Sequence, residues 1–270
     1  MSNQYDVLGK APGSEELKKL APENNHVTIK KLSAGYGKME ILHDFNLNVS
    51  KAQSLCLIGP NGAGKSTLIK QIVGSVKHDI GSIILDQEDI TDLTDIERAK
   101  IGISRTFQVS SVIPKFSALE NIILSLLEKN QKTFQLFQNL QSNKDLFSKA
   151  ERILIEIELD NQSSTLASEL SHGDRRKLEV GLALAMNPKV FLFDEPMAGL
   201  DEAGTKMMIN LFKKIKSQSP ILLIEHDMDA VFALADRVSV IVYGKIVATG
   251  TVEEIKSNTL VHDVYLGYEV

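Results

Sequence analysis

Cysteine is almost absent from this sequence of 270 residues. The single cysteine, Cys56, cannot form a disulfide within the chain, and one cysteine cannot supply a zinc cluster. Because Cys56 lies in an apolar run that is typical of a strand, we expect its thiol to be buried and unreactive. This use of cysteine is typical of a reducing, cytoplasmic compartment.

Long apolar runs and an excess of positive charge are also missing. No run approaches the roughly 18 residues of a membrane-spanning helix, and the N-terminal stretch lacks the apolar centre of a secretory signal. The 30 lysines and arginines are outnumbered by 35 acidic residues, which gives a net charge of −5. Dedicated nucleic-acid binders usually carry a basic surface. We therefore expect no nucleic-acid partner, and contact with a membrane only through a partner protein.

The composition is that of a globular protein, with 43% hydrophobic and 24% charged residues. Residues 1–26 are polar, and we expect them to form a loose N-terminal extension with a short helix near residues 15–20. The chain is long enough for one large domain or two small ones, and we assign residues 27–270 to a single domain.

Two kinds of strand pattern follow the extension. The segments "HVTIKKL" and "FNLNV" alternate apolar and polar residues, which is typical of half-buried antiparallel strands. Continuous apolar runs are typical of buried parallel strands, and the sequence has four of them: "SLCLIG", "KVFLFDE", "PILLIEH" and "RVSVIVYG". The last run turns at residues 243–245 into "IVATG", which predicts a hairpin.

A helical block separates the first of these runs from the others, at about residues 110–175. Ser117 and Glu120 form the capping pattern S-x-x-E ahead of an apolar stripe at helical spacing. Residues 145–158 repeat the same spacing. The sequence therefore predicts at least two amphipathic helices in this block.

The segment "GPNGAGKST" follows the apolar run "SLCLI" and leads into the helical sequence "LIKQIVG". It matches the phosphate-binding pattern G-x-x-x-x-G-K-[ST] in the context that the pattern requires, between a strand and a helix. Glycines let backbone N–H groups approach the phosphates of ATP, and the helix N-terminus adds the positive end of its dipole. We expect the lysine to reach the β- and γ-phosphates and the serine to bind Mg²⁺. The nucleotide-binding residues expected here are Gly59, Asn61, Gly62, Gly64, Lys65, Ser66 and Thr67.

A pair of acids ends the apolar run "VFLFDE". Carboxylates at the C-terminal edge of a parallel strand face the crevice where ligands bind. We therefore expect Asp194 to bind Mg²⁺ and Glu195 to polarise the attacking water. Such a pair on its own is more often a solvated strand end, so this prediction depends on the phosphate-binding loop.

Six motifs occur in one order along the chain. They are "GPNGAGKST", "RTFQ" ending at Gln108, "LSHGD", "VFLFDEP", "AGLD", and "LLIEH" ending at His226. Their order and spacing resemble the ATP-binding subunits of ABC transporters, over about residues 27 to 250. The resemblance implies an α/β fold: a P-loop NTPase core with a mostly parallel sheet, an N-terminal antiparallel β-subdomain and an inserted α-helical subdomain.

The resemblance also implies roles for single residues. Gln108 would sense the γ-phosphate and Mg²⁺, His226 would be the switch histidine, and Tyr36 would stack on adenine. Taken alone, these three would more often be a surface amide, a core histidine and a turn residue. The family works as a head-to-tail dimer of two copies or two related subunits. Ser171 and Gly173 of "LSHGD" would therefore complete the ATP site of the partner subunit, the first as a helix cap with a free hydroxyl, the second by letting the backbone approach phosphate.

The segment "LSHGD" departs from the family pattern at two positions. His172 stands where many members have glycine, and it would face either the nucleotide of the partner subunit or solvent. Asp174 replaces the usual glutamine or glutamate. It keeps the capping pattern but adds a negative charge near phosphate.

Finer features point to a subgroup. The segments "GISRTFQ" and "LLIEHDMDAV" and the tail "VHDVYLG" resemble the ATPase subunits of branched-chain amino-acid and urea importers. ATPases of lipopolysaccharide export end in a similar tail and are the alternative. The resemblance implies integral-membrane permeases as partners and a location at the inner face of the cell membrane.

Two other functions are weaker alternatives. A soluble ABC ATPase acting on DNA or ribosomes would usually carry two nucleotide-binding halves or a long insertion, whereas the interval from Gln108 to Ser171 is 171 − 108 = 63 residues. A GTPase-like switch would need the pattern N-K-x-D, and "NKDL" at residues 143–146 has its aspartate one place too early.

The segment "VSSVIPKF" at residues 109–116 carries three apolar side chains close to Gln108. Val112, Ile113 and Phe116 would either bind a permease helix or pack inside the helical subdomain. The sequence leaves both possibilities open.

Overall fold

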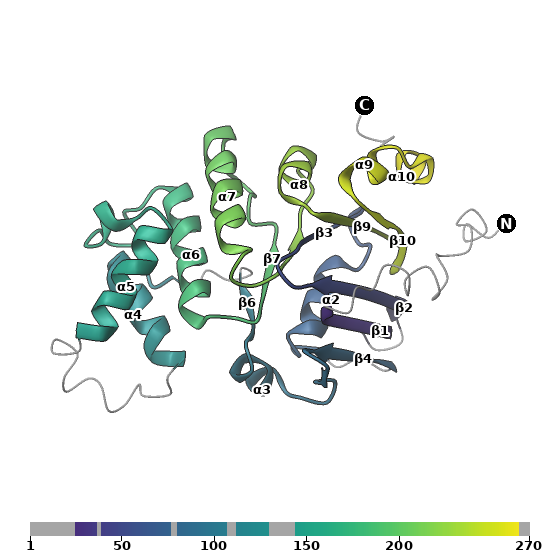
Figure 1. Ribbon diagram of the computed structural model, residues 1–270, viewed down its shortest axis with the longest axis horizontal. Helices are drawn as coiled ribbons and strands as arrows, with labels where there is room; N and C mark the ends of the chain where they lie inside the picture. The colour runs from purple at the N-terminus through teal and green to yellow at the C-terminus, as the bar shows by residue number, and fades with distance from the viewer. Residues whose placement is uncertain (1–24, 37–38, 77–79, 107–111, 130–143, 265–270) are drawn as a thin grey trace.

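The computed structural model describes residues 25–36, 39–76, 80–106, 112–129 and 144–264. Two β-sheets pack together, and a block of helices lies beside the larger sheet (Figure 1). The helix predicted near residues 15–20 and the side chain of Gln108 lie outside the described residues. The predicted α/β fold with an antiparallel and a mostly parallel sheet is confirmed.

The smaller sheet is antiparallel and has the strand order β2-β1-β4-β5. Its strands are β1 (Asn25–Tyr36), β2 (Met39–Ser50), β4 (Ile80–Leu85) and β5 (Glu88–Asp89). The alternating patterns predicted the first two strands but not the last two. Strand β1 begins two residues before the predicted domain boundary, because His26 already pairs with Asp86 next to β4 and with the backbone of Lys189 next to β7.

The larger sheet has the order β10-β9-β3-β8-β7-β6, parallel except for the hairpin β9–β10. Its strands are β3 (Ser54–Ile58), β6 (Ile103–Thr106), β7 (Val190–Asp194), β8 (Ile221–Ile224), β9 (Arg237–Val242) and β10 (Lys245–Gly250). All four apolar runs are strands of this sheet, and the hairpin is confirmed. Strand β6 was missed, because "ISRT" is short, partly polar and shows no alternation.

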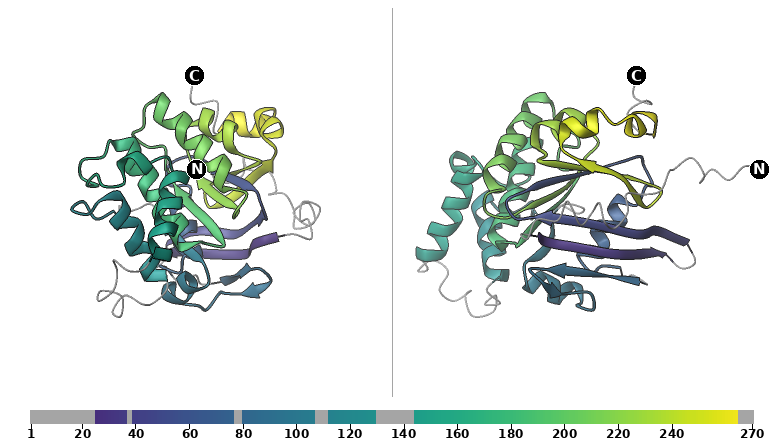
Figure 2. Two further views of the ribbon diagram at one scale, coloured as in Figure 1. Left: turned by 60° about the vertical axis from the view of Figure 1, so that its left-hand side comes forward. Right: turned by 45° about the vertical axis from the view of Figure 1, so that its right-hand side comes forward.

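Nine α-helices occur in the described ranges: α2 (Lys65–Ile72), α3 (Asp95–Lys100), α4 (Ala118–Lys129), α5 (Lys144–Glu156), α6 (His172–Met186), α7 (Glu202–Ile215), α8 (Met228–Leu234), α9 (Val252–Lys256) and α10 (Thr259–Val264). The predicted capping box is present at α4, since Ser117 N–H donates to Glu120 Oε2 at 2.7 Å and Glu120 N–H to Ser117 Oγ at 3.2 Å. Helices α4, α5 and α6 pack on one another and form the helical block, on the side of the larger sheet away from β1 and β2 (Figure 2). None of the described helices combines the length and the hydropathy needed to cross a membrane.

Strand β3 contributes to both hydrophobic cores of the molecule. Its alternate residues Leu55 and Leu57 face the core shared with the antiparallel sheet and α2. Cys56 and Ile58 face the core that continues into the helical block. Because side chains alternate along a strand, a strand buried on both faces reads as the continuous apolar run that predicted it. Burial also raises the pKa of the Cys56 thiol, as expected for an unreactive cysteine.

The guanidinium of Arg98 in α3 fastens the C-terminal end of α2. Arg98 is only 2% exposed. Its Nη1 donates to the carbonyl oxygens of Gln71 (2.6 Å) and Ile72 (2.9 Å), while Nη2 and Nε donate to those of Thr91 (2.7 Å) and Leu93 (3.1 Å). Carbonyls at a helix C-terminus lack intrahelical donors and carry partial negative charge. A buried guanidinium supplies both hydrogen-bond donors and a positive charge to them.

Replacing Arg98 by methionine should destabilise the fold. Arg98→Met keeps much of the apolar volume but removes the Arg98 bonds of four buried or half-buried carbonyls, of which only that of Gln71 is shown to keep a backbone donor, Gly74 N–H. This loss should lower the free energy of unfolding by roughly 3 kcal/mol. Urea denaturation followed by circular dichroism measures this loss. The exposed neighbour Lys100→Met is the control, with an expected change below about 0.5 kcal/mol. Equal stabilities of the two variants would contradict the role given to Arg98.

Candidate functional site

The loop between β3 and α2 has a positive φ at three of its positions, which favours glycine there. Gly59 has φ +153°, Gly62 has φ +79° and Gly64 has φ +108°. A Cβ atom on Gly59 would lie 2.0 Å from the carbonyl oxygen of Ile241. The sequence pattern and the tertiary packing therefore both require glycine here.

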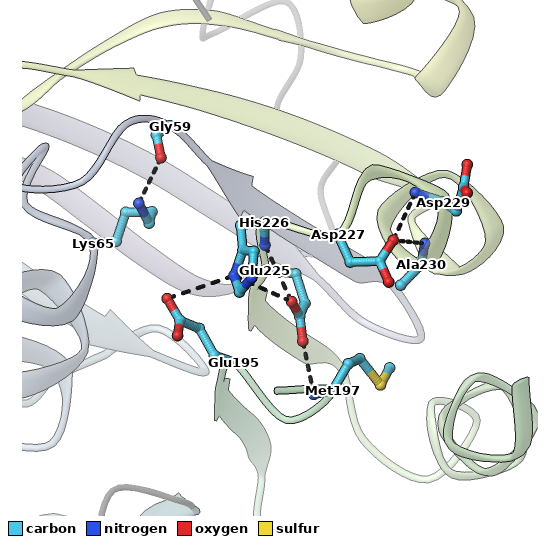
Figure 3. A network of polar contacts seen from close by, with 9 residues as sticks. All are labelled: Gly59, Lys65, Glu195, Met197, Glu225, His226, Asp227, Asp229 and Ala230. Atoms are coloured by element: carbon cyan, nitrogen blue, oxygen red, sulfur yellow. Dashed lines mark hydrogen bonds and ion pairs between the residues drawn. The ribbon is translucent and has the colours of Figure 1, made fainter. Parts of the chain in front are cut away.

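Lys65 begins α2 and points back into this loop. Its ammonium Nζ donates to the carbonyl oxygen of Gly59 at 2.6 Å (Figure 3). It also donates to the carbonyl oxygen of Pro60 at 3.0 Å. Burial lowers the pKa of Lys65, while the charges of Glu195 and Asp194 raise it. The carboxylates of Glu195 and Asp194 are therefore close enough to Lys65 to act on its charge.

The other predicted residues of the loop differ in their exposure. Asn61 and Gly62 are exposed, Ser66 is half-buried in the first turn of α2, and Thr67 is buried. Helix α2 packs against β7, the strand that ends at Asp194. A hydroxyl and one carboxylate are hard oxygen donors, which Mg²⁺ prefers when it is also bound by phosphates and water.

The strand register brings the ends of β3, β8 and β7 to one edge of the sheet. Ile224, the last residue of β8, pairs with Leu57 on one side and with Asp194 on the other. The phosphate-binding loop, the residues after Ile224 and the acidic pair therefore follow three adjacent strands. Ligands of such open sheets bind at this edge.

Glu195 has a strained backbone at this edge. Its φ of +52° lies in the left-handed region, which is unusual for a residue other than glycine. Its N–H donates to the carbonyl oxygen of Ile224 at 2.9 Å. Strain of this kind persists only where surrounding contacts hold it, and it is concentrated at functional sites.

His226 lies beside Glu195, as Figure 3 shows. Its Nδ1 is 3.8 Å from Oε1 of Glu195, and both side chains are exposed. The acid and the imidazole thus share a solvent-facing space, within reach of one bridging water.

Sequence reasoning missed Glu225, which also belongs to this network. It is the most buried carboxylate among the described residues, with 1% of its surface exposed. Its Oε1 accepts from the N–H of Met197 at 2.8 Å, and its Oε2 accepts from the N–H of His226 at 3.1 Å. Burial raises the pKa of Glu225, and these backbone donors oppose the rise. The available signal was an acid directly after the apolar strand sequence "ILLI".

Two predicted site residues are not placed by the structure. Tyr36 is the last residue of β1 and pairs with Met39, but its side chain lies outside the described part of the chain. Gln108 also lies outside it. The adenine contact of Tyr36 and the γ-phosphate contact of Gln108 remain predictions.

Ser171 caps helix α6 as predicted, and Asp174 is part of the cap. The N–H of Asp174 donates to Ser171 Oγ at 3.1 Å, and this hydroxyl donates to Asp174 Oδ2 at 2.8 Å. Gln162 and Lys177 also contact the carboxylate, both at 3.2 Å. Partial burial raises the pKa of Asp174, but these bonds outweigh it and lower the pKa below its ordinary value. Lys177 therefore balances the charge that Asp174 adds to this loop.

His172 is exposed, and its ring lies over Gly199 of the "AGLD" segment. The ring atom Cε1 is 3.3 Å from the position that a Cβ atom on Gly199 would occupy. The "LSHGD" and "AGLD" segments thus touch within one chain. Helix α6 belongs to the helical block, whereas α2 lies against the strands on the other side of Figure 1.

Comparison with known proteins agrees with this geometry. Residues 42–198 match the protein family described as "ABC transporter". A probable branched-chain amino acid transport ATP-binding protein, LivG of Archaeoglobus fulgidus, is 32% identical, and the match covers 87% of this chain and 93% of that protein. The lipopolysaccharide export system ATP-binding protein LptB of Haemophilus influenzae is 31% identical, covering 89% and 97%. The ADP conformation of MJ1267, an ATP-binding cassette of an ABC transporter, superimposes with a TM-score of 0.79 at 30% identity, covering 90% and 99%.

Proposed function

This chain belongs to the ABC transporter family as an ATP-hydrolysing subunit, and on that premise we propose that it drives the import of branched-chain amino acids, other amino acids or urea. The LivG relatives, at 31–32% identity, support this substrate class. The LptB relative is equally similar over the same share of the chain. Lipopolysaccharide export is therefore the second candidate.

Nucleotide binding rests on the loop between β3 and α2. Its backbone N–H groups and the start of α2 attract the phosphates of ATP. Lys65 exchanges its bonds to the Gly59 and Pro60 carbonyls for phosphate oxygens. Ser66 and Asp194, with Gln108, hold Mg²⁺, which neutralises charge on the phosphates when bound. Tyr36 stacks on the adenine.

Hydrolysis rests on Glu195 and His226. A carboxylate that faces solvent beside the phosphate site can accept a proton from the attacking water. His226, 3.8 Å from that carboxylate, lies where an imidazole can contact both the water and the γ-phosphate. The juxtaposition of Lys65, Glu195 and His226 at one sheet edge is the observation that carries this assignment.

A partner subunit completes each site. Ser171 and Gly173 begin a helix of the helical block and are available to a second molecule, with Ser171 exposed at the surface. A head-to-tail dimer of two copies, or of this chain with a related subunit, would bring them to the γ-phosphate bound by the other chain. The Ser171 hydroxyl then turns from Asp174 towards the phosphate.

An exposed apolar turn offers a surface for the permease. Val112 is buried, but Ile113 and Phe116 are 41% and 38% exposed, and Leu166 next to them is 38% exposed. The buried Asn121 fixes this turn by bonds to both backbone groups of Ile113 and to the carbonyl of Phe116. Docking of a permease helix on this turn would hold residues 27–270, as one nucleotide-binding domain, at the inner face of the membrane.

Glu195→Gln should bind ATP but hardly hydrolyse it. The amide keeps the shape of the side chain but cannot accept the proton of water, so a loss of at least about 100-fold in turnover is expected for a missing general base. The bound nucleotide should accumulate in a dimer, which size exclusion with ATP and Mg²⁺ detects. Turnover at the wild-type rate would exclude Glu195 as the base.

Two inactive variants should restore activity when they are mixed. Lys65→Ala damages the phosphate loop, and Ser171→Arg damages the segment that serves the partner. A mixed dimer contains one site built from two intact halves, so partial ATPase recovery is expected. Lys65→Ala mixed with Glu195→Gln is the control, because both defects lie on the phosphate-loop side and leave no intact site. Recovery in neither mixture, with mixed dimers demonstrated, would count against a site shared by two chains.

The complex purified with its permeases and placed in vesicles should import leucine or urea when ATP is supplied on the side of this subunit. Ile113→Asp should abolish this uptake and leave the ATPase activity of the isolated subunit within about twofold of wild type, because a charge on the turn opposes docking of an apolar helix.

The exposed Ile155 of α5 supplies the matched control. Ile155→Asp carries the same charge on the same helical block and should transport normally. Loss of solubility by Ile113→Asp alone would show that Ile113 packs in the core instead. Release of lipopolysaccharide from the vesicles, without leucine or urea uptake, would favour the export function.

A further inference from the structure

Glu225 occupies an unusual position for a charged residue. It directly follows β8, the strand between the phosphate-binding strand β3 and the acidic strand β7. Its carboxylate is 1% exposed, although burying an ion away from water carries a large free-energy cost unless hydrogen bonds compensate. The contacts of the Glu225 carboxylate must therefore compensate the free-energy cost of its burial.

The carboxylate of Glu225 is held by backbone N–H groups of the two loops that carry Glu195 and His226, at Met197, His226 and Asp227. Oε1 accepts from the N–H of Met197, two residues after Glu195, and Oε2 accepts from the N–H of His226. Oε2 also lies 3.9 Å from Nδ1 of His226. The imidazole of His226 therefore lies between two carboxylates, because Glu195 Oε1 is 3.8 Å from the same nitrogen (Figure 3).

These hydrogen bonds hold the backbone of Glu195 in its strained conformation. Its left-handed φ must be held from outside. The N–H of Glu195 donates to the carbonyl of Ile224, and the N–H of Met197 donates to the side chain of Glu225. Two successive residues at the end of β8 thus fasten the acidic segment at two points, one on Glu195 and one just beyond it.

We propose that Glu225 is a positioning residue for ATP hydrolysis: its buried carboxylate fixes the backbone after Glu195 and at His226, and it keeps a negative charge 3.9 Å from the His226 ring. The inference rests on the proposed function, in which Glu195 and His226 act on the attacking water. Glu225 is buried, whereas Glu195 and His226 are exposed. It should therefore affect turnover through these two residues, without changing the phosphate-binding loop.

Glu225→Gln tests this role with little change of volume. The amide oxygen can still accept from Met197, but the NH₂ group cannot accept from His226 N–H, and the negative charge near Nδ1 is gone. We expect kcat to fall by about tenfold while KM and the Kd for ATP stay within about twofold of wild type. A matching loss of ATP affinity and melting temperature would indicate a merely structural role and overturn the proposal, as would an unchanged kcat.

Two further variants sharpen the test. Glu179→Gln removes another buried carboxylate, 7% exposed and paired with Arg176 in α6, and should leave kcat within about twofold. An equal loss there would show a general effect of removing buried charge. In a double-mutant cycle with His226→Ala, the combined loss should fall short of the product of the two single losses, since groups that act through each other are not additive. Fully multiplicative losses would overturn the proposal.

Hydrogen exchange on the wild-type chain tests the contacts without any variant or nucleotide. The amides of Met197 and His226 should exchange at least about tenfold more slowly than exposed loop amides, because a buried carboxylate holds both. Exchange at the rate of exposed amides would overturn the inference even if Glu225→Gln failed to fold. If the wild-type chain hydrolyses no ATP, the proposed function and this inference fall together. If it hydrolyses ATP and Glu225→Gln is equally fast, this inference alone fails.

Discussion

The parallel pairing of β3, β8 and β7 is the constraint on which the rest of the structure depends. Because Ile224 pairs with both Leu57 and Asp194, three loops leave the sheet at one edge. One loop carries Lys65 and, in the proposed function, binds phosphate through its backbone N–H groups. The other two carry an acid and an imidazole. No single segment of the chain holds all three chemical functions, so the hydrogen-bond register of the sheet sets the distances between them.

Buried charge supports this edge from two sides. Arg98 donates to the carbonyls at the C-terminal end of α2 and so holds in place the helix that begins at Lys65. Glu225 receives backbone N–H groups from the two loops that carry Glu195 and His226. Both residues are costly to bury and tolerable only because every bond is made with good geometry. Hydrogen bonds to buried charges fix the positions of backbone segments more narrowly than apolar packing alone. Hydrolysis requires this precision, whereas folding does not.

The helical block is held mainly by contacts of its own and not by the residues at the sheet edge. The start of α6 is fixed within its own block, since Ser171, Asp174, Gln162 and Lys177 form a closed set of contacts. In this set the negative charge of Asp174 is compensated by Lys177. His172 links this segment to Gly199, which follows the acidic strand. The two segments that carry "LSHGD" and "AGLD" are therefore in contact within one chain.

The sequence by itself determined the elements whose cause is local. Apolar runs predicted every central strand of the larger sheet, because a strand buried on both faces must be apolar throughout, and glycine spacing predicted the phosphate loop, because the backbone needs its freedom there. Ser117 predicted a helix start from its capping pattern and the apolar stripe after it, and Ser171 was expected as a cap within the family motif. Strand β6, the clamp of Arg98 and the role of Glu225 were decided only by the tertiary structure. Their partners lie far away along the chain: Gln71 is 27 residues from Arg98, and Met197 is 28 residues from Glu225. Read locally, Arg98 is one more charge on a short helix and Glu225 one more acid at a strand end, and only the fold brings to each the backbone groups that explain its burial.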